Sequence, residues 1–392
     1  SNPYSNDGLS SLVNTSISRF SPDPDNQPTG NPATRRQRVD LLDDDFQMPT
    51  VARANLAVEH RLPWLGFIAS AEALQTWTLE GLTYRNLNLR RTGTGPDGRA
   101  IYGNRTASFA LSSNSQYQHS EYADVYLLTN TDRGRATQLT ARLRRPLRGF
   151  WGASFSYTRS DVREVSPVTS STAATNFSTR MSLDPNDEEP GTASTQIRDR
   201  ILASGTLRFS FIRRLDTRIT LAYEGRSGRP YSFIFGSDVN GDSADYSNDL
   251  FYVPAGPSDP KVRWASAEQK DAFFTYLLSN PRLARFAGQV VPRNSERSRF
   301  VHQFDLKLSQ QITLWRTWRA EIFGDVINLG NLLNPRWGRI EQVSFPYGLI
   351  VANASYDPTA NQYVYRYTAA RTETLQPGPS RWQIQGGVRV RF

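Results

Sequence analysis

The amino-acid sequence predicts an all-β protein, a transmembrane antiparallel β-barrel with long extracellular loops, and three observations support this prediction. The last strand, at 381–392, alternates apolar and polar residues, as expected where one face meets lipid and the other a watery lumen. No run in the chain approaches the roughly 18 apolar residues that a membrane helix needs. The connections between predicted strands alternate between short and long, as periplasmic turns and extracellular loops do in such barrels.

The last strand shows the alternation most clearly. One face carries Trp382, Ile384, Gly386, Val388, Val390 and Phe392, and the other carries Arg381, Gln383, Gln385, Gly387, Arg389 and Arg391. An arginine-lined face would be costly inside a soluble sandwich. The pattern therefore favours a membrane strand.

The composition is compatible with this fold and excludes several kinds of site. Hydrophobic residues make up 38% of the chain, which is enough for a barrel because only alternate strand residues must be apolar. The absence of cysteine excludes disulfides, thiolate nucleophiles and Cys-zinc sites. The net charge of +9 is compatible with nucleic acid or an anionic membrane surface as partner. Because the arginines recur along strands instead of forming a block, we expect the membrane and no nucleic acid.

Each predicted strand is based on an alternation of apolar and polar residues within its range. Residues 1–47 are rich in Ser, Asn, Pro and Asp without a sustained period, so we expect an extracellular loop there. Residues 48–392 are expected to supply the barrel strands; in the first strand, for example, Leu56 and Val58 alternate with Ala57 and Glu59. The strands are expected at 51–62, 67–77, 124–147, 151–158, 201–211, 218–226, 302–312, 318–326 and 381–392.

Short turns are expected at one end of these strands, at 62–66, 147–150, 212–217 and 314–317. Aromatic residues lie beside them: Trp64, Phe67, Phe150, Trp151, Phe211, Trp315 and Trp318. Such residues form a girdle at a membrane interface. The alternative, a core of aromatics in a soluble sandwich, explains the residues but not the alternation of turn lengths.

The longest connection, at 228–299, is expected to be an extracellular insertion that contains a short helix. Ser266-Ala-Glu-Gln269 resembles a capping box, and Phe273 and Leu277 follow at helical spacing before Pro281. A second short helical turn is expected at 328–334.

The predicted number of strands is odd. A closed bacterial barrel made from one chain has an even number of strands, and an open sheet in lipid would leave unpaired edges. We therefore expect the chain to be the C-terminal part of a barrel. The first strands would come from a missing N-terminal segment or from a separate chain.

Charged residues on the polar side of the strands are candidates for lining the lumen. They are Arg53, Glu59, Glu72, Arg142, Arg208, Arg218, Glu224, Arg319, Glu321 and Asp325. The alternative is that they only keep the lumen wet and pair with one another, and for any single residue this alternative is favoured.

A candidate calcium loop lies within the insertion. Asp238, Asn240 and Asp242 occupy alternate positions and Asp249 follows, and hard cations prefer several such oxygens. However, Ser243 stands where an EF-hand has glycine, and the twelfth position is Asp249 in place of glutamate. The favoured alternative is a solvated loop of Asx-turns, in which Asp and Asn are also the typical residues.

The order of motifs resembles the C-terminal half of a TonB-dependent outer-membrane transporter. The segments GRPYSFIFGSDVNGD, NDLFYVP, GQVVPRN, FVHQFDLKLSQQI and EIFGDVINLGNLLN precede the terminal strand, and DDFQMPTVARANLAVEHRLPW lies upstream. Within that superfamily the chain resembles the Oar-like branch, which is related to SusC-like proteins. The resemblance covers nearly the whole chain from about Asp43.

The resemblance implies a 22-stranded barrel in the outer membrane of a Gram-negative bacterium, closed by an N-terminal plug. It implies uptake of a large or scarce substrate with energy from TonB, although some Oar-like members are linked to protein export. Outer-membrane lipid, lipopolysaccharide and the barrel-assembly machinery would be partners, and Phe392 would be the assembly signal. The chain departs from the family because no plug and no TonB box is found in it; both would lie in the missing segment, through which TonB would act.

An enzyme is not expected. His60, His119 and His302 are the three histidines, and no Ser-His-Asp set, metal triad or phosphate loop is recognisable. Two other functions stay open beside transport. One is a structural or adhesive surface protein, and the other is a soluble carbohydrate-binding protein.

Overall fold

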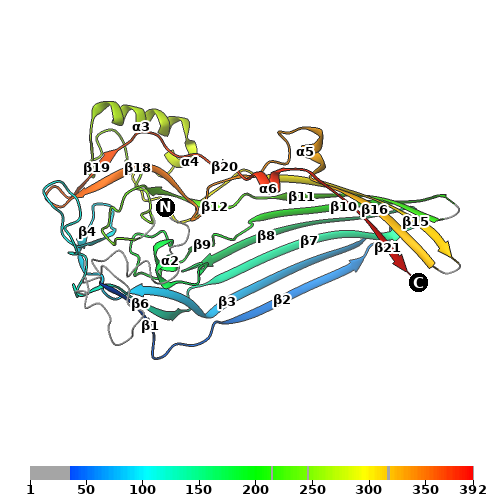
Figure 1. Ribbon diagram of the computed structural model, residues 1–392, viewed down its shortest axis with the longest axis horizontal. Coiled ribbons are helices and arrows are strands. Elements are labelled where there is room, and N and C mark those ends of the chain that lie inside the picture. Colours follow the sequence, from blue (N-terminus) through cyan, green and yellow to red (C-terminus); the bar gives the residue numbers. More distant parts are fainter. Residues whose placement is uncertain (1–35, 213–214, 245–246, 316–317, 392) are drawn as a thin grey trace, which may run out of the picture.

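Nine long strands form one antiparallel sheet in the computed structural model, which describes residues 36–212, 215–244, 247–315 and 318–391. Each long strand lies beside the next one along the chain (Figure 1). They are β2 (Thr50–Arg61), β3 (Ile68–Asn86), β7 (Arg135–Arg148), β8 (Trp151–Glu164), β10 (Asp199–Ile212), β11 (Leu215–Arg226), β15 (Val301–Trp315), β16 (Trp318–Ile327) and β21 (Gln383–Arg391). The prediction of an all-β fold and of these strands is confirmed.

Short and long connections lie at opposite ends of the sheet. The short ones join β2 to β3, β7 to β8, β10 to β11 and β15 to β16, at what we call the short-turn end. At the other end, the long-connection end, the chain makes excursions of tens of residues between strands (Figure 1). Residues 213–214 and 316–317, which belong to two of the predicted turns, lie outside the described residues.

The third predicted strand is divided in two. Its first half is β6 (Tyr122–Thr131), which pairs with the C-terminal part of β3, and its second half is β7, which pairs with the N-terminal part. Asp132–Gly134 interrupt the strand, and the Gly134 carbonyl accepts a hydrogen bond from the Thr78 amide (2.9 Å). The alternation thus predicted the strand but not the irregularity.

The prediction that residues 1–47 form only a loop is wrong in part. β1 (Gln37–Leu42) pairs in parallel with β6, from Gln37 beside Tyr122 to Leu42 beside Leu128. This strand was missed because Val39, Leu41 and Leu42 are too few for a clear period, and its partner lies about eighty residues further along the chain. Residues 1–35 lie outside the described residues.

The insertion at 228–299 is not an independent loop, because it shares a second sheet with the excursion that precedes β21. This five-stranded sheet contains β12 (Pro230–Phe235), β13 (Val262–Trp264), β14 (Glu296–Arg297), β18 (Gly348–Asp357) and β19 (Gln362–Arg366), in the order β13-β19-β18-β12-β14. Two helices, α3 (Ala267–Ser279) and α4 (Pro281–Ala284), accompany it. We call these seven elements the cap (Figure 1).

The largest cluster of buried apolar residues lies in the cap, not between the long strands. Phe233, Phe235, Phe251, Phe273 and Tyr365 are all nearly fully buried there. The helix predicted after Ser266 is confirmed, since the Ser266 side chain accepts a hydrogen bond from the Gln269 amide (3.3 Å) at the start of α3. The cap is therefore a structured unit with its own core.

Short elements complete the long-connection end. The connection between β3 and β6 contains a hairpin of β4 (Arg91–Thr94) and β5 (Ala100–Tyr102). The predicted turn at 328–334 is confirmed as α5 (Leu329–Leu333). The others are α2 (Ala173–Ser178), β9 (Gly191–Thr192), β17 (Glu341–Gln342), β20 (Thr374–Leu375) and α6 (Pro377–Ser380).

The long sheet is open within the described residues. β2 pairs only with β3 at one edge, and β21 pairs only with β16 at the other. None of the helices in the described part of the chain is long and apolar enough to cross a membrane.

Candidate functional site

The long sheet has one apolar face that is largely exposed in the described structure. The cross-strand registers place Val58, Ala71, Ala141, Tyr157 and Ile201 in one row on this face. Leu56 is 77% exposed, Leu139 is 53% exposed and Val388 is 65% exposed. Large apolar side chains therefore point outward along the sheet, in contrast to the buried core of the cap.

The opposite face is polar, and the registers place all ten predicted lumen residues on it. For example, Glu59, Ser70, Arg142 and Ser156 lie side by side on four neighbouring strands. The same face continues through Arg208 and Arg218 to the C-terminal strands. There Glu321 lies beside Arg389, Asp325 beside Lys307, and Arg319 beside Thr313, while Arg53 and Glu72 lie on β2 and β3.

Most carboxylates on the polar face have basic or amide partners. Glu59 pairs with Arg144 (3.4 Å), Glu224 with Arg200 (2.9 Å), Asp325 with Lys307 (3.0 Å), and Glu321 with Arg389 (3.6 Å). Glu72 accepts a hydrogen bond from Asn55 (2.9 Å), Arg218 pairs with Asp216 (3.0 Å), and Arg208 donates to the Gly149 carbonyl (2.7 Å). These contacts favour a wet, mutually paired face over a dedicated binding site among these ten residues.

Aromatic side chains gather at the short-turn end. The rings of Trp64 and Phe67 lie 5.4 Å apart, those of Phe67 and Trp151 lie 6.0 Å apart, and Phe150 is exposed. The guanidinium of Arg145 lies 3.9 Å from the centre of the Trp151 ring. Nothing is described of the side chains of Phe211, Trp315 and Trp318, and Phe392, the predicted assembly signal, lies outside the described residues.

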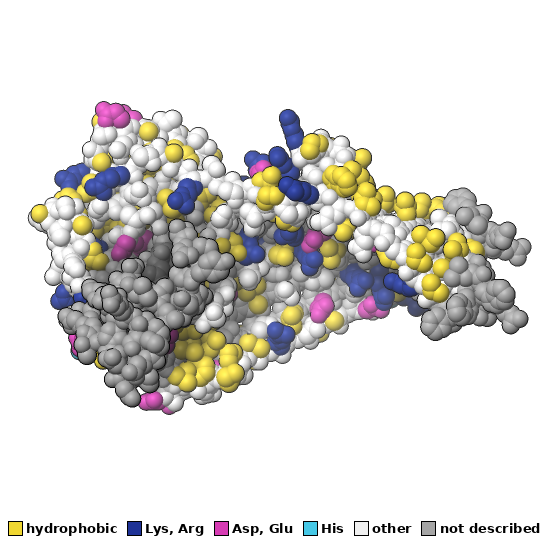
Figure 2. Space-filling view, in the orientation of Figure 1, with side chains coloured by type: hydrophobic (Ala, Val, Ile, Leu, Met, Phe, Trp, Pro, Cys, Tyr) yellow, Lys and Arg dark blue, Asp and Glu magenta, His cyan; other side chains and the backbone are white. Residues whose placement is uncertain are grey.

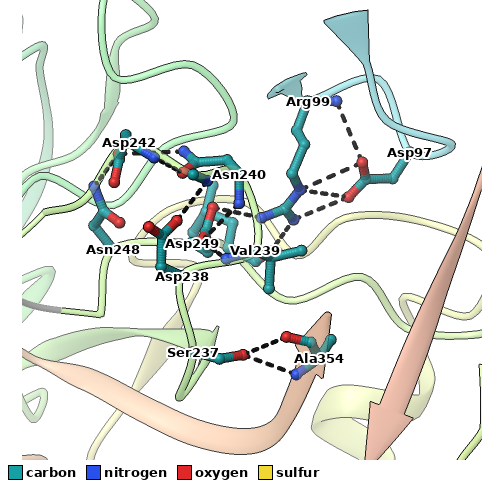
Figure 3. Close-up of polar contacts among 12 residues, drawn as sticks. Asp97, Arg99, Ser237, Asp238, Val239, Asn240, Asp242, Asn248, Asp249 and Ala354 are labelled. Atoms are coloured by element: carbon teal, nitrogen blue, oxygen red, sulfur yellow. Dashed lines mark hydrogen bonds and ion pairs between the residues drawn. The ribbon is translucent and has the colours of Figure 1, made fainter. Parts of the chain in front are cut away.

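A buried arginine joins three segments at the long-connection end (Figure 3). Arg99, in the β4–β5 hairpin, is 0% exposed and pairs with Asp97 (2.9 Å) and with Asp249 of the insertion (2.7 Å). Its guanidinium also lies 5.2 Å from the ring centre of Phe235, and Tyr363 of β19 donates a hydrogen bond to Asp97. We call Asp97, Arg99, Asp249 and Tyr363 the Arg99 cluster.

Burial and the charge of the Arg99 guanidinium act in opposite directions on the pKa values of the two carboxyl groups in the Arg99 cluster. Burial alone would raise the pKa of Asp97, but the Arg99 charge and its hydrogen bonds hold that pKa below its ordinary value. Burial raises the pKa of Asp249 to about 6 although Arg99 lies beside it. The sequence did not indicate this cluster, because its members are far apart in the chain and no local motif contains them.

The candidate calcium loop forms a network of turns in which every carboxylate oxygen accepts a hydrogen bond (Figure 3). Asp238 accepts from the amides of Gly241 (2.5 Å) and Ser243 (3.0 Å). Asp242 accepts from the Ala244 amide (2.9 Å) and from the side chains of Asn240 (3.2 Å) and Asn248 (2.8 Å).

The remaining loop oxygens are occupied in the same way. Asp249 accepts from the Val239 amide (2.7 Å) and from Arg99, and the Asn240 side chain accepts from the Asp242 amide (2.8 Å). Burial, with Asp238 and Asp249 nearby, raises the pKa of Asp242 to about 8. No group of three or more His, Cys, Asp or Glu side chains in the described residues is placed to hold a metal. The contacts favour the Asx-turn interpretation over the calcium site.

Calcium is therefore expected to leave the insertion unchanged. Limited proteolysis of the insertion should proceed at the same rate in millimolar calcium and in excess chelator, because protein donors already satisfy the loop oxygens. The control is Asp238→Asn, which disturbs the turn and should speed cleavage equally in both conditions. If calcium slowed cleavage of the parent protein but not of this variant, the result would contradict the Asx-turn interpretation and support a calcium site.

The histidines do not form a catalytic set with one another. His60 and His302 lie on the apolar face, where His302 contacts the Tyr223 hydroxyl (2.8 Å), and His119 lies 3.8 Å from Glu121. Comparison of the chain with protein-family models and with curated proteins finds no match.

Proposed function

We propose that this chain forms part of a β-barrel in the outer membrane of a Gram-negative bacterium, and that the complete barrel is a TonB-dependent transporter for a large or scarce substrate. The observation that carries the proposal is the exposed apolar face of the long sheet, opposite the polar face on which the ten predicted lumen residues lie. The order of sequence motifs supports the transporter class.

The distribution of apolar residues is unfavourable for a protein surrounded by water. Monomeric soluble proteins rarely expose contiguous apolar patches beyond a few hundred Å². Here the exposed side chains extend from Leu56 on β2 to Val388 on β21, across the whole sheet. In lipid the same face is favourable, while the paired charges on the other face stay in a watery lumen.

The open edges imply partner strands. In hydrocarbon each unpaired backbone amide or carbonyl costs several kcal/mol, so sheets that span membranes close on themselves. β2 and β21 each present one unpaired edge within the described residues. We infer that strands from outside these residues, from the same gene or a separate chain, pair with both edges; a 22-stranded barrel with a plug would satisfy this.

The cap favours a second candidate, a structural or adhesive surface protein. It has its own sheet and core, and so presents a rigid surface at the long-connection end. The complete gene distinguishes the two functions. A plug and a TonB-binding segment encoded beside the barrel, and uptake that is lost when TonB is deleted, would support transport, whereas their absence would support the surface protein.

Membrane extraction tests the location. We expect the protein to stay in bacterial outer membranes washed with carbonate and to be released only by detergent, because its apolar face would be exposed to water otherwise. Intact-mass analysis of the extracted protein should then reveal either a longer chain or a second co-purifying segment. Release without detergent, in a monodisperse state, would contradict the proposal and favour the soluble carbohydrate-binding alternative.

A further inference from the structure

A pocket of about 510 Å³ lies on the apolar side of the sheet, between β15 and the segment around α5. The first residues of β15 and the two residues before it, Arg299 and Phe300, form one wall, and the segment 330–341 forms the other. Figure 2 shows basic and hydrophobic side chains gathered around α5, where this segment rises from the sheet. The pocket thus lies where the apolar face meets the long connections.

The base of the pocket is aromatic and continuous with the apolar face. His302 and Phe304 lie in register with Gly225 and Tyr223 on that face, and the rings of Phe304 and Tyr223 are 4.8 Å apart. Phe304 is 40% exposed, and Trp337 on the facing segment is 58% exposed. An extended apolar chain that left the pocket would therefore continue along the outer surface of the strands.

The rim of the pocket is basic. Arg299, Arg336 and Arg339 line it, and all three are exposed. Arg299 pairs with Glu341 (3.2 Å), but in the described part of the chain no carboxylate pairs with Arg336 or Arg339. Two guanidiniums beside an aromatic pocket are suited to an anionic group, and arginine binds phosphate oxygens with two parallel hydrogen bonds.

We propose that this pocket binds a phosphorylated lipid of the leaflet at the long-connection end. The phosphate lies against Arg336 and Arg339, and an acyl chain lies over Phe304 and Trp337. The inference rests on the proposed membrane location and adds a specific ligand site to it. Because the pocket opens on the apolar face and not on the polar face, its ligand comes from the membrane and not from the lumen.

The basic rim and the aromatic base of the pocket together favour a phosphorylated lipid over a free anion. Inorganic phosphate would contact only the exposed rim, where the guanidiniums are well hydrated and a single ion pair contributes little. A lipid adds burial of its acyl chain against the aromatic base, at about 25 cal/mol for each Å² of apolar surface. Trp337 has the amphipathic ring that prefers the boundary between headgroups and acyl chains.

The test uses the native protein in phosphatidylcholine vesicles that contain a minor fraction of brominated phosphatidic acid. Bromine quenches nearby indoles, so the difference between the parent and Trp337→Phe reports lipid at Trp337. We expect stronger quenching of Trp337 by brominated phosphatidic acid than by the same fraction of brominated phosphatidylcholine. In the double variant Arg336→Gln/Arg339→Gln, the apparent affinity should fall about tenfold, as expected for the loss of charge-assisted contacts.

Two controls separate the possible failures. Arg371→Gln removes an exposed arginine outside the pocket and should leave the quenching unchanged. Excess inorganic phosphate should not displace the lipid; displacement would show a free-anion site and overturn the proposal. If the protein floats with the vesicles but shows no preference for phosphatidic acid, only this inference fails. If it does not float with them, both this inference and the proposed location fail.

Discussion

Replacing Arg99 by methionine is expected to weaken the cap by about 3–5 kcal/mol, the range found when one partner of a buried ion pair is removed. The substitution leaves the buried carboxylates of Asp97 and Asp249 without their shared cation. Hydrogen exchange of the β12 and β19 amides measures the effect, since both strands carry side chains that contact Arg99. The long sheet, which lies outside the cluster, should keep its protection.

A matched variant tests whether charge is the cause. Adding Asp97→Asn and Asp249→Asn to Arg99→Met removes the uncompensated charges, so part of the lost protection should return. Arg371→Met, which replaces an exposed arginine between β19 and β20, should have little effect. Equal protection in Arg99→Met and the parent protein would show that the cluster does not hold the three segments together.

Leu139→Arg is expected to destabilise the membrane-inserted protein by about 2–4 kcal/mol, the cost of a basic residue near the bilayer midplane on the lipid face of a barrel. Leu139 lies in the first half of β7, on the exposed apolar face. Unfolding of the complete protein from vesicles by denaturant, followed by tryptophan fluorescence, measures the change.

The neighbouring residue provides the control. Gln138 is exposed on the opposite, polar face of the same strand, so Gln138→Arg should change the stability by well under the cost of Leu139→Arg. In a water-soluble protein Leu139 would already contact water, and both substitutions would be nearly neutral. Two small and equal effects would therefore contradict a lipid-facing role for the apolar face.

Period-two alternation was sufficient to predict the long strands and their two faces. Successive side chains of a strand point to opposite sides, so a residue such as Glu59 reveals its face through Val58 and His60 alone. Helix capping is equally local, and Ser266 predicted the start of α3 correctly. A short turn also forces the two strands that it joins to pair, as β7 and β8 do.

The pairings between distant segments could not be predicted in this way. β1 pairs with a strand about eighty residues further on, and β12 pairs with β18 more than a hundred residues further on. The hydrogen bonds of such pairs come from the backbone, which leaves no mark on the side chains at either position. The Arg99 cluster was missed for the same reason, since its ion pairs depend on where three connections meet.

The chain thus contains two kinds of information. Its local alternation was enough for the two-faced sheet and for the face on which Arg142 or Leu139 lies, because side-chain direction repeats every two residues. Only the folded chain revealed the cap, the burial of Arg99 and the hydrogen-bonded state of the Asp238–Asp249 loop. These features depend on contacts between segments far apart in sequence. Burial determines how strongly charged groups interact, and it exists only once those segments are packed together.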